Sequence, residues 1–514
     1  MRTGPLPRLA AALAACALLG ACGSATPADV STPTASASVI PSPVGAPRAR
    51  LLDWPEFGLD PQRSDVSTRS TGITAANVAQ LRRVTISLPG TVDSSPVYLH
   101  EASAAGAVRS VVVVTTTYGK TLALDAGSGR ILWKFTPPGY SRWAGSAQIT
   151  TTSPLADPSR RFVYAASPDG LIHKLSIANG SEVAGWPVPM TRDATHEKLA
   201  AALNIEGPYL IAATGGYFGD APPYQGHVAL IDRETGRIAS VFNTLCSNRR
   251  SVIAPSSCSA SDSAVLSRGG PVVEPGGKRL LISTGNGPWN GATDFGDSVI
   301  ELSLPGLRFR QAFTPTNQAE LSESDTDLGS SAPVLLGQSR VLIAGKDGVM
   351  RLLSLQRLDG HPPSVPSRLG GELQRMPLPG GGELFSAPAV WTASTGPRQR
   401  SSTTVFVGGE HATAAYALIG GRLHLVWQNG NPGTSPVMAG GLLYVYDPTG
   451  GGIYVYRPRS SRPIAKLPGS PGHWNNPIVV DGHVVEPEGD ANEHKLSGTL
   501  ELFSAPVPSP SRPF

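Results

Sequence analysis

Charged residues are scarce in this chain of 514 residues, since Asp, Glu, Lys and Arg make up 16% and the formal net charge is +4. The Lys and Arg residues are scattered and form no basic stripe, so we expect no nucleic-acid partner. Long helical periodicity is also missing. Gly and Pro, in contrast, make up about a fifth of the chain, as in proteins with many tight turns. The composition therefore favours an all-β fold.

Long apolar runs are absent except near the N-terminus, where Arg2 and Arg8 precede the letters LAAALAACALLGAC. This run is too short for a stable membrane span and is typical of an export signal. It ends in LGAC, which resembles the lipobox of bacterial lipoproteins. We therefore predict a lipoprotein signal peptide over residues 1–21 and lipidation of Cys22. The alternative is an ordinary cleaved signal with a chance cysteine at its end.

Large apolar groups are nearly absent from residues 22–50, which are rich in Ser, Thr, Pro and Ala and predict a flexible tether. Residues 506–514 are expected to form a disordered tail. Cysteine is scarce too, and beyond the N-terminal segment only Cys246 and Cys258 remain. In an exported protein this pair predicts a disulfide, with a metal site as the alternative. We expect the protein to be anchored in the cell membrane by its lipid and to face the extracytoplasmic side.

A proline motif returns along residues 51–505. Its copies read SSPVYL, TSPLA, EGPYLI, GGPVVE, SAPVLL, SAPAVW, TSPVMA and NNPIVV, with prolines at Pro96, Pro154, Pro208, Pro271, Pro333, Pro388, Pro436 and Pro477. A β-branched run follows each copy, and then strands joined by Gly-containing turns, so each unit reads as a four-stranded antiparallel meander. We predict an eight-bladed β-propeller in which each proline starts the innermost strand. Seven blades are the alternative, because EGPYLI is a poor copy, and a row of β-sandwich domains is another.

The stretch LALDAGSGRILWKF resembles the repeat of proteins named for pyrroloquinoline quinone (PQQ). In that family a Trp docks each blade onto its neighbour, and Trp133, Trp186 and Trp427 stand at such positions. The segment from LLDWPEFGLDPQRSDVS to GITAANVAQLRRV is similar to the lead-in of quinoprotein alcohol dehydrogenases. The resemblance implies that this segment supplies an outer strand, which closes the ring against the last blade.

The same resemblance implies a cofactor site on the propeller axis that holds PQQ and calcium. STGNGPWN resembles the motif that places Asn286 as a calcium ligand, and FGDSVIEL places Asp297 as the catalytic base and a further metal ligand. GKDGVMRLL places Lys346 against the quinone oxygens. Asp220 is the carboxylate available as the remaining calcium ligand in the third blade. Calcium prefers several such oxygen ligands.

Several expected parts of that site are missing from the sequence. The third blade lacks the calcium-binding Glu, and SAVLSRGG stands where a Trp should form the floor under the quinone. The vicinal cysteine pair and the haem motif CxxCH are absent. Alternatively, therefore, Asn286 satisfies a tight turn, Asp297 caps backbone amides, and Lys346 pairs with Asp347, Asp325 or Asp327. The last two carboxylates, in DTDLGSS, could hold a cation or belong to a solvated turn.

Together these patterns predict an extracytoplasmic, membrane-anchored propeller lipoprotein that serves as a platform for a small ligand or an envelope protein. The degenerate quinoprotein-type site on its axis leaves open whether the protein is an enzyme. The alternative function is that of a calcium- and PQQ-dependent dehydrogenase that oxidises alcohols or sugars.

Overall fold

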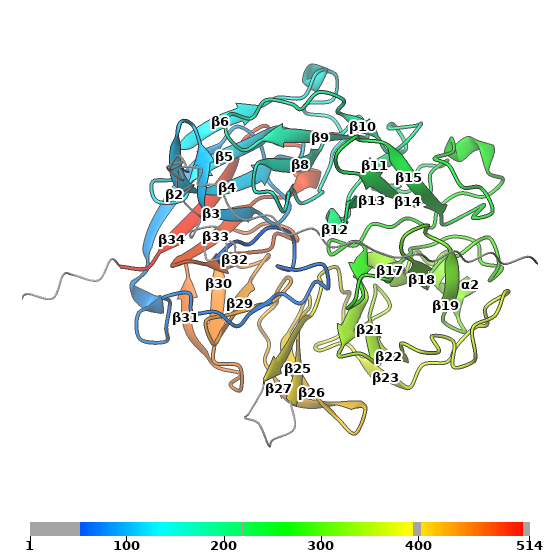
Figure 1. The fold of residues 1–514 in the computed structure, drawn as a ribbon. Helices are drawn as coiled ribbons and strands as arrows, with labels where there is room; N and C mark the ends of the chain where they lie inside the picture. Colours follow the sequence, from blue (N-terminus) through cyan, green and yellow to red (C-terminus); the bar gives the residue numbers. More distant parts are fainter. Residues whose placement is uncertain (1–51, 218, 394–401, 507–514) are drawn as a thin grey trace, which may run out of the picture. The chain divides into compact units, whose positions relative to one another are not determined.

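The computed structural model describes residues 52–506 apart from residue 218 and residues 394–401. Its strands form eight sheets, which follow one another around a centre in chain order (Figure 1). Each sheet is built on four antiparallel strands, so the fold is the predicted eight-bladed β-propeller. The predicted signal peptide, Cys22 and the tether lie outside the described residues, as does nearly all of the predicted tail.

The first four blades are meanders of consecutive strands. Blades one and two consist of β3 (Val97–Ala104), β4 (Ala107–Thr115), β5 (Thr121–Asp125), β6 (Ile131–Phe135), β7 (Leu155–Ala156), β8 (Phe162–Ala166), β9 (Leu171–Ser176) and β10 (Val188–Pro189). Blades three and four consist of β11 (Glu197–Leu199), β12 (Asn204–Glu206), β13 (Tyr209–Gly216), β14 (His227–Asp232), β15 (Ile238–Asn243), β16 (Val272–Val273), β17 (Arg279–Ser283), β18 (Val299–Ser303) and β19 (Phe309–Phe313).

The last four blades follow the same plan. Blades five and six consist of β20 (Val334–Leu336), β21 (Arg340–Ile343), β22 (Val349–Ser354), β23 (Gln374–Pro377), β24 (Ala389–Ala393), β25 (Ser402–Gly408), β26 (Thr413–Ile419) and β27 (Arg422–Gln428). Blades seven and eight consist of β1 (Val66–Ser67), β28 (Val437–Ala439), β29 (Leu442–Tyr446), β30 (Ile453–Tyr456), β31 (Pro463–Leu467), β32 (Ile478–Val480), β33 (His483–Glu488), β34 (Gly498–Ser504) and β2 (Arg82–Leu88).

Helical structure in the described residues is confined to single turns or little more. These are α2 (Gln318–Glu323) and the 3-10 turns η1 (Val78–Gln80), η2 (Tyr140–Arg142), η3 (Pro255–Ser257), η4 (Leu328–Ser330) and η5 (Ala491–Glu493). None of the described helices is both long and apolar enough to cross a membrane.

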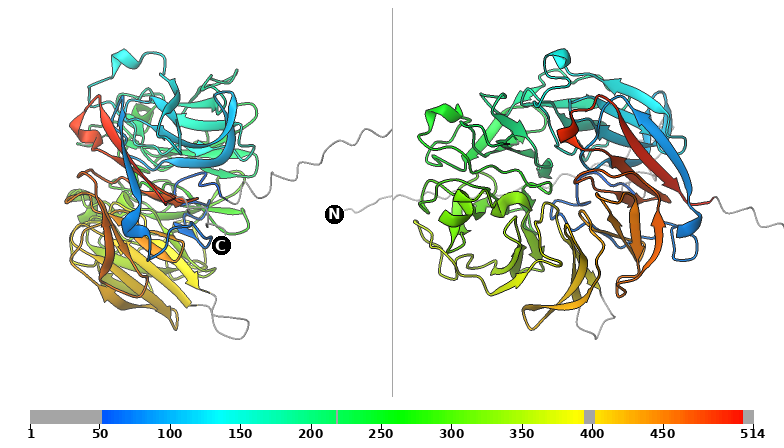
Figure 2. Two further views of the ribbon diagram at one scale, coloured as in Figure 1. Left: turned by 90° about the vertical axis from the view of Figure 1, so that its left-hand side faces the viewer. Right: turned by 180° about the vertical axis from the view of Figure 1, so that it is seen from behind.

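Strands from the beginning and the end of the described chain form the last blade together. Strand β2 pairs antiparallel with β34 from Arg82 opposite Ser504 to Leu88 opposite Gly498. Both figures show the blue strand β2 beside the red strand β34, from the front in Figure 1 and from behind in Figure 2. The N-terminal segment therefore supplies the outer strand of the last blade and closes the ring, as the resemblance implies.

The repeated prolines mark the strands nearest the axis, with one exception. First strands of neighbouring blades contact one another, which places them innermost, and the motif proline directly precedes this strand in every blade but the third. There the innermost strand is β12, and Pro208 starts β13 instead. The prediction for Pro208 is therefore wrong. Pro208 follows Gly207, whose φ of 54° makes the turn, in a position where no backbone donor is needed.

The hydrophobic core lies between blades. Val228 of blade three and Ile300 of blade four, for example, are fully buried in one cluster. Trp133 Nε1 donates to the Ile177 carbonyl of the next blade at 2.8 Å, and Trp427 Nε1 donates to Pro458 at 2.9 Å. Trp186 is also buried, but its Nε1 has no hydrogen-bond partner among the described residues. The Trp positions therefore contact the neighbouring blades as predicted.

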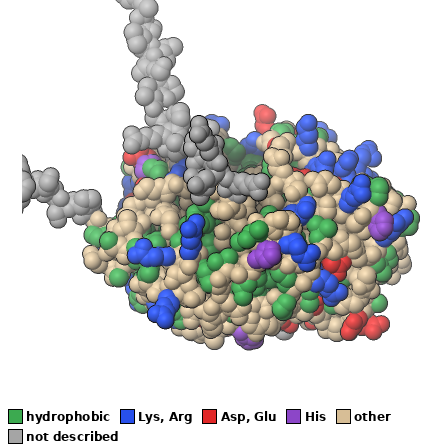
Figure 3. Space-filling view, turned by 90° about the horizontal axis from the view of Figure 1, so that it is seen from below, with side chains coloured by type: hydrophobic (Ala, Val, Ile, Leu, Met, Phe, Trp, Pro, Cys, Tyr) green, Lys and Arg blue, Asp and Glu red, His purple; other side chains and the backbone are tan. Residues whose placement is uncertain are grey.

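The surface is mixed in character. On the face seen in Figure 3, Lys and Arg side chains are scattered among hydrophobic ones and do not gather in one stripe. Large hydrophobic side chains are exposed singly or in pairs, such as Leu425 and Val426 on β27. Such scattered apolar groups are ordinary on protein surfaces.

Candidate functional site

A cavity of about 440 Å³ lies on the axis of the ring. Its walls come mainly from the segments that lead into the innermost strands, so that nearly every blade contributes. The charged and aromatic residues that line it are Asp93, Lys198, Tyr217, Asp220, Arg268, Asp325, Asp327, Lys346, Glu383, Phe385, His473 and Trp474. A cavity of this size with a mixed apolar and charged lining is typical of a small-molecule site.

Lys346 reaches this cavity from the turn after β21, and two carboxylates hold it. Its Nζ lies 2.6 Å from Asp327 Oδ2 and 3.0 Å from Asp325 Oδ1. Burial opposes the charge of the ammonium, but the carboxylates outweigh burial and raise the pKa of Lys346 above its ordinary value. The same carboxylates bind Asn286, whose backbone N–H donates to Asp327 and whose Nδ2 donates to Asp325, both at 2.7 Å.

Asp297 lies close to this network, but its carboxylate bonds to other groups. The side chain is fully buried and is not part of the cavity wall. Its Oδ1 accepts from the Leu328 N–H at 3.1 Å, and its Oδ2 accepts from Gln318 Nε2 of α2 at 3.4 Å. Burial, with a contribution from the charge of Asp327, raises the pKa of Asp297 to about 8. A carboxyl with this pKa can hold or release a proton near neutral pH.

Asp220 lies in the turn after β13 and lines the cavity directly. Its carboxylate accepts a hydrogen bond from Tyr224 Oη at 2.9 Å. Burial raises the pKa of Asp220, and the nearby charges of Asp327 and Asp325 raise it further. Asp220, Asn286, Asp297 and Lys346 are therefore all near one end of the cavity, although only Asp220 and Lys346 face it.

Arg268 occupies the position where the resemblance places the Trp floor, directly before GGPVVE. Its guanidinium pairs with Asp93 Oδ1 at 3.0 Å and donates to the Asp93 carbonyl at 2.8 Å. Asp93 Oδ2 in turn lies 2.7 Å from His473 Nδ1. Burial opposes ionisation of Asp93, but the charges of Arg268 and His473 hold its pKa below the ordinary value.

Three aromatic rings stack beside this ion pair. The centroid of the Trp474 ring lies 4.1 Å from the centroid of Phe385 and 3.7 Å from that of His473. The guanidinium carbon of Arg268 lies 5.1 Å from the Trp474 centroid. Sequence reasoning missed this cluster. The letters SRGG marked Arg268 as a departure, but no local pattern linked Asp93 to residues 380 positions away.

Comparisons with known proteins agree with this architecture. Residues 74–296, less than half of the chain, match the family model described as outer membrane protein assembly factor BamB. A stretch of 143 residues is 29% identical to the dehydrogenase subunit of an alcohol dehydrogenase (quinone) from Gluconobacter oxydans. That stretch is 27% of this chain and 18% of the relative, so the match spans less than a fifth of the relative.

Two solved structures have a similar fold. The quinohemoprotein alcohol dehydrogenase from Comamonas testosteroni is 15% identical, with a TM-score of 0.62, over 91% of this chain and 83% of that chain. A europium-containing methanol dehydrogenase is 14% identical, with a TM-score of 0.64, over 89% of this chain and 99% of that one. The protein is a PQQ-like β-propeller. At these identities the structural likeness shows the fold alone.

The donors in this PQQ-like propeller do not form a calcium ligand set. Calcium takes about six to eight oxygen ligands. Within the described ranges, three ligand atoms of His, Cys, Asp or Glu approach within 4.8 Å at two places, Asp93–His473–Asp490 and Cys246–Cys258–Asp294. Neither place contains Asp220 or Asp297. Asn286 Oδ1 is buried without a partner in the described part of the chain, but it offers one oxygen only. The assignment of Asn286, Asp297 and Asp220 to calcium therefore stays a prediction.

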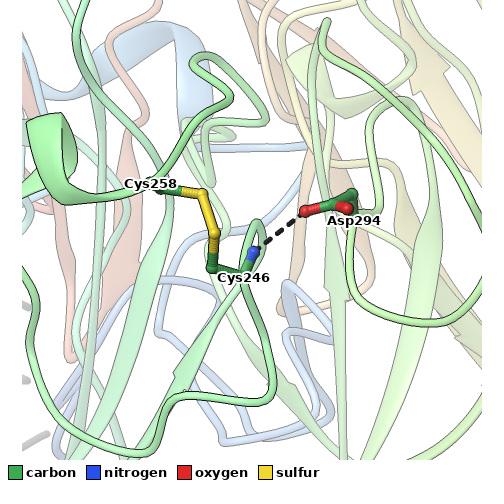
Figure 4. Close-up of side chains that lie close together, drawn as sticks. All are labelled: Cys246, Cys258 and Asp294. Carbon is green, nitrogen blue, oxygen red and sulfur yellow. Dashed lines mark hydrogen bonds between the residues drawn. A yellow bond between two sulfur atoms is a disulfide. The ribbon is translucent and has the colours of Figure 1, made fainter.

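The predicted disulfide between Cys246 and Cys258 is confirmed, and it closes a loop of the third blade (Figure 4). Asp294 lies beside it and accepts a hydrogen bond from the Cys246 backbone N–H at 2.9 Å. Because both sulfurs are joined to each other, this cluster offers no thiolate to a metal. Its role is to fix the loop.

Proposed function

We propose that the protein is a lipid-anchored, extracytoplasmic propeller that binds a small ligand in its axial cavity. The LGAC motif at Cys22, the tether that follows it and the disulfide support placement outside the cytoplasm. The cavity of about 440 Å³, with aromatic and charged walls, supports a small ligand. An envelope protein is the other class of partner, supported by the description of the family model that matches residues 74–296.

The observation that carries this proposal is the pairing of the axial side chains with one another. Lys346 and Asn286 are engaged by Asp325 and Asp327 rather than directed to a cofactor. Arg268, a charged group, stands where a Trp floor would stack on a quinone. A binding platform is compatible with both features, whereas quinone binding would require the axial ion pairs to rearrange.

The second candidate is the calcium- and PQQ-dependent dehydrogenase acting on alcohols or sugars. It is favoured by the names of the relatives and by the closeness of Asp297 to the network that Lys346 and Asn286 share. Bound PQQ would supply the two-electron oxidation of the alcohol, which no side chain can provide. In the present arrangement the donor set does not fit the cofactor, so we assign no reaction step to it.

Titration of the purified protein with PQQ, in calcium and in a chelator, separates the two candidates. We expect no calcium-dependent, saturable binding of the quinone and no dye reduction with alcohols or aldoses. Saturable binding with turnover would refute the platform, and Asp297→Ala would then be expected to abolish the turnover while leaving the fold intact. Turnover that survives in this variant would refute the assignment of Asp297 as the base.

The lipid anchor is tested separately on the full chain expressed in a bacterium. Wild-type protein should partition with membranes and incorporate a labelled fatty acid, and Cys22→Ser should remove both properties. Cys16→Ser is the matched control, because this cysteine lies within the predicted signal peptide and should have no effect. Membrane partition that is equal in all three proteins would contradict lipidation at Cys22.

A further inference from the structure

Lys198 presents an unneutralised ammonium group to the axial cavity. It lies in β11 between Glu197 and Leu199, which are both buried on the opposite side of the strand, so the alternation turns Lys198 toward the cavity. Its Nζ makes no hydrogen bond or ion pair with any described residue. The centroid of the Tyr217 ring lies 5.6 Å from Nζ.

The charges around Lys198 leave its own charge uncompensated. Arg268 lies on the same wall, and Asp93 is already bound to Arg268 and His473. Asp220 is the other carboxylate whose charge acts on Lys198, and it already accepts a hydrogen bond from Tyr224 Oη. Burial, together with the charge of Arg268, lowers the pKa of Lys198 to about 8. Lys198 and Arg268 are thus neighbouring cations, and neither nearby carboxylate pairs with Lys198, so an anion that pairs with Lys198 here would gain electrostatic energy.

The walls beside the two cations are apolar. Tyr217, Trp474 and Phe385 contribute aromatic surface, and Ile149 and Leu266 contribute aliphatic surface. Such surface favours an organic body rather than a small inorganic ion, because an organic body buries apolar surface away from water. The acidic end of the cavity, where Asp325 and Asp327 neutralise Lys346, gives no comparable site for an anion.

We propose that the axial cavity binds an organic carboxylate, whose anionic group pairs with Lys198 beside Arg268 and whose apolar body packs against Tyr217 and Trp474. The inference rests on the proposed function and names the class of its ligand. It requires neither calcium nor Asp297.

Isothermal titration with naphthoate and with its neutral amide tests this assignment on the full folded chain. Naphthoate is expected to bind in the presence of a chelator, and the amide is expected to bind about tenfold more weakly or not at all. Lys198→Met should weaken naphthoate binding about tenfold or more, the value expected for the loss of a charge-assisted hydrogen bond. Lys134→Met, an exposed lysine on the outer strand β6, removes the same charge at a distance and should leave the affinity unchanged.

Proton uptake on binding gives a second readout, which a merely structural lysine would not affect. Since the free amine has a pKa of about 8 and a bound anion raises it, binding near pH 8 should take up a proton. Titrations in two buffers of different ionisation enthalpy measure this uptake in the wild-type protein, even if Lys198→Met fails to fold. Uptake that is absent in Lys198→Met but present in Lys134→Met supports the assignment.

Three results would overturn it. Equal binding of naphthoate and the amide, or full affinity in a folded Lys198→Met, would show that the ligand is not recognised through this charge, and the small-ligand platform would stand. Absence of any binding of the organic acid would reject the ligand class. PQQ is itself an aromatic carboxylate, so PQQ binding that persists in the chelator agrees with this assignment and does not count against the platform. Calcium-dependent binding with turnover counts against the platform alone, so the two failures are distinguishable.

Discussion

Replacing Asp297 with Asn is expected to stabilise the protein above neutral pH. Burial raises the pKa of Asp297 from the ordinary 3.8 to about 8, so the folded state retains a proton that the unfolded chain releases. The stabilising contribution of this group is complete below about pH 4 and is lost as the pH rises through 8. At about 1.4 kcal/mol for each pH unit, the loss is on the order of 5 kcal/mol, and a neutral amide avoids it.

The assay is urea denaturation followed by tryptophan fluorescence between about pH 5 and pH 9. The free energy of unfolding should fall with pH in the wild-type protein and much less in Asp297→Asn, whose side-chain oxygen still accepts from the Leu328 N–H. Asp232→Asn is the control, because hydrogen bonds from Thr235 lower the pKa of Asp232 in an open turn. The difference in free energy of unfolding between Asp232→Asn and the wild-type protein should be constant over this pH range. Parallel curves for the wild-type protein and Asp297→Asn would refute the reasoning.

Replacing Cys246 and Cys258 with Ser should lower the free energy of unfolding by about 3 kcal/mol, since the bridge closes a loop of 12 residues. Denaturation with and without reductant measures the loss, and equal stabilities would contradict it. Gly180→Ala should destabilise more than Gly207→Ala. Both glycines have positive φ, which costs about 1 kcal/mol. Only at Gly180 would a Cβ meet the Trp133 ring, at 2.5 Å, so overpacking adds roughly 1–3 kcal/mol. Equal melting temperatures would contradict this difference.

The ring could be predicted from sequence because its determinants are local. Proline cannot donate to a ladder, so it marks the start of a strand, and glycine makes the turns that join the next strands. These two rules hold wherever a copy is intact. What fails at Pro208 is the assignment of the following strand to the innermost position, because an additional short strand, β12, precedes the motif and takes the place nearest the axis.

The network around Lys346 could be predicted in part. The motif GKDG fixed its place at the turn after β21, and the alternative that it pairs with Asp325 and Asp327 matches the structure. A motif gives the position of a side chain, but its charge state and direction depend on neighbours from other blades. For this reason the burial of Asp297 beneath the cavity could not be predicted from FGDSVIEL.

Arg268, which stands where the resemblance places a Trp, depends on the closure of the ring for its ion-pair partner. A buried guanidinium needs a carboxylate, and Asp93 supplies it from the segment just after β2. His473, the second partner of that carboxylate, comes from the segment just before β32 in the same last blade. Pairing of β2 with β34 therefore brings Asp93 and His473 together, so the ion pair that holds Arg268 near Lys198 depends on closure of the ring. A variant that weakens the β2–β34 pairing should lose carboxylate binding before it loses the other blades.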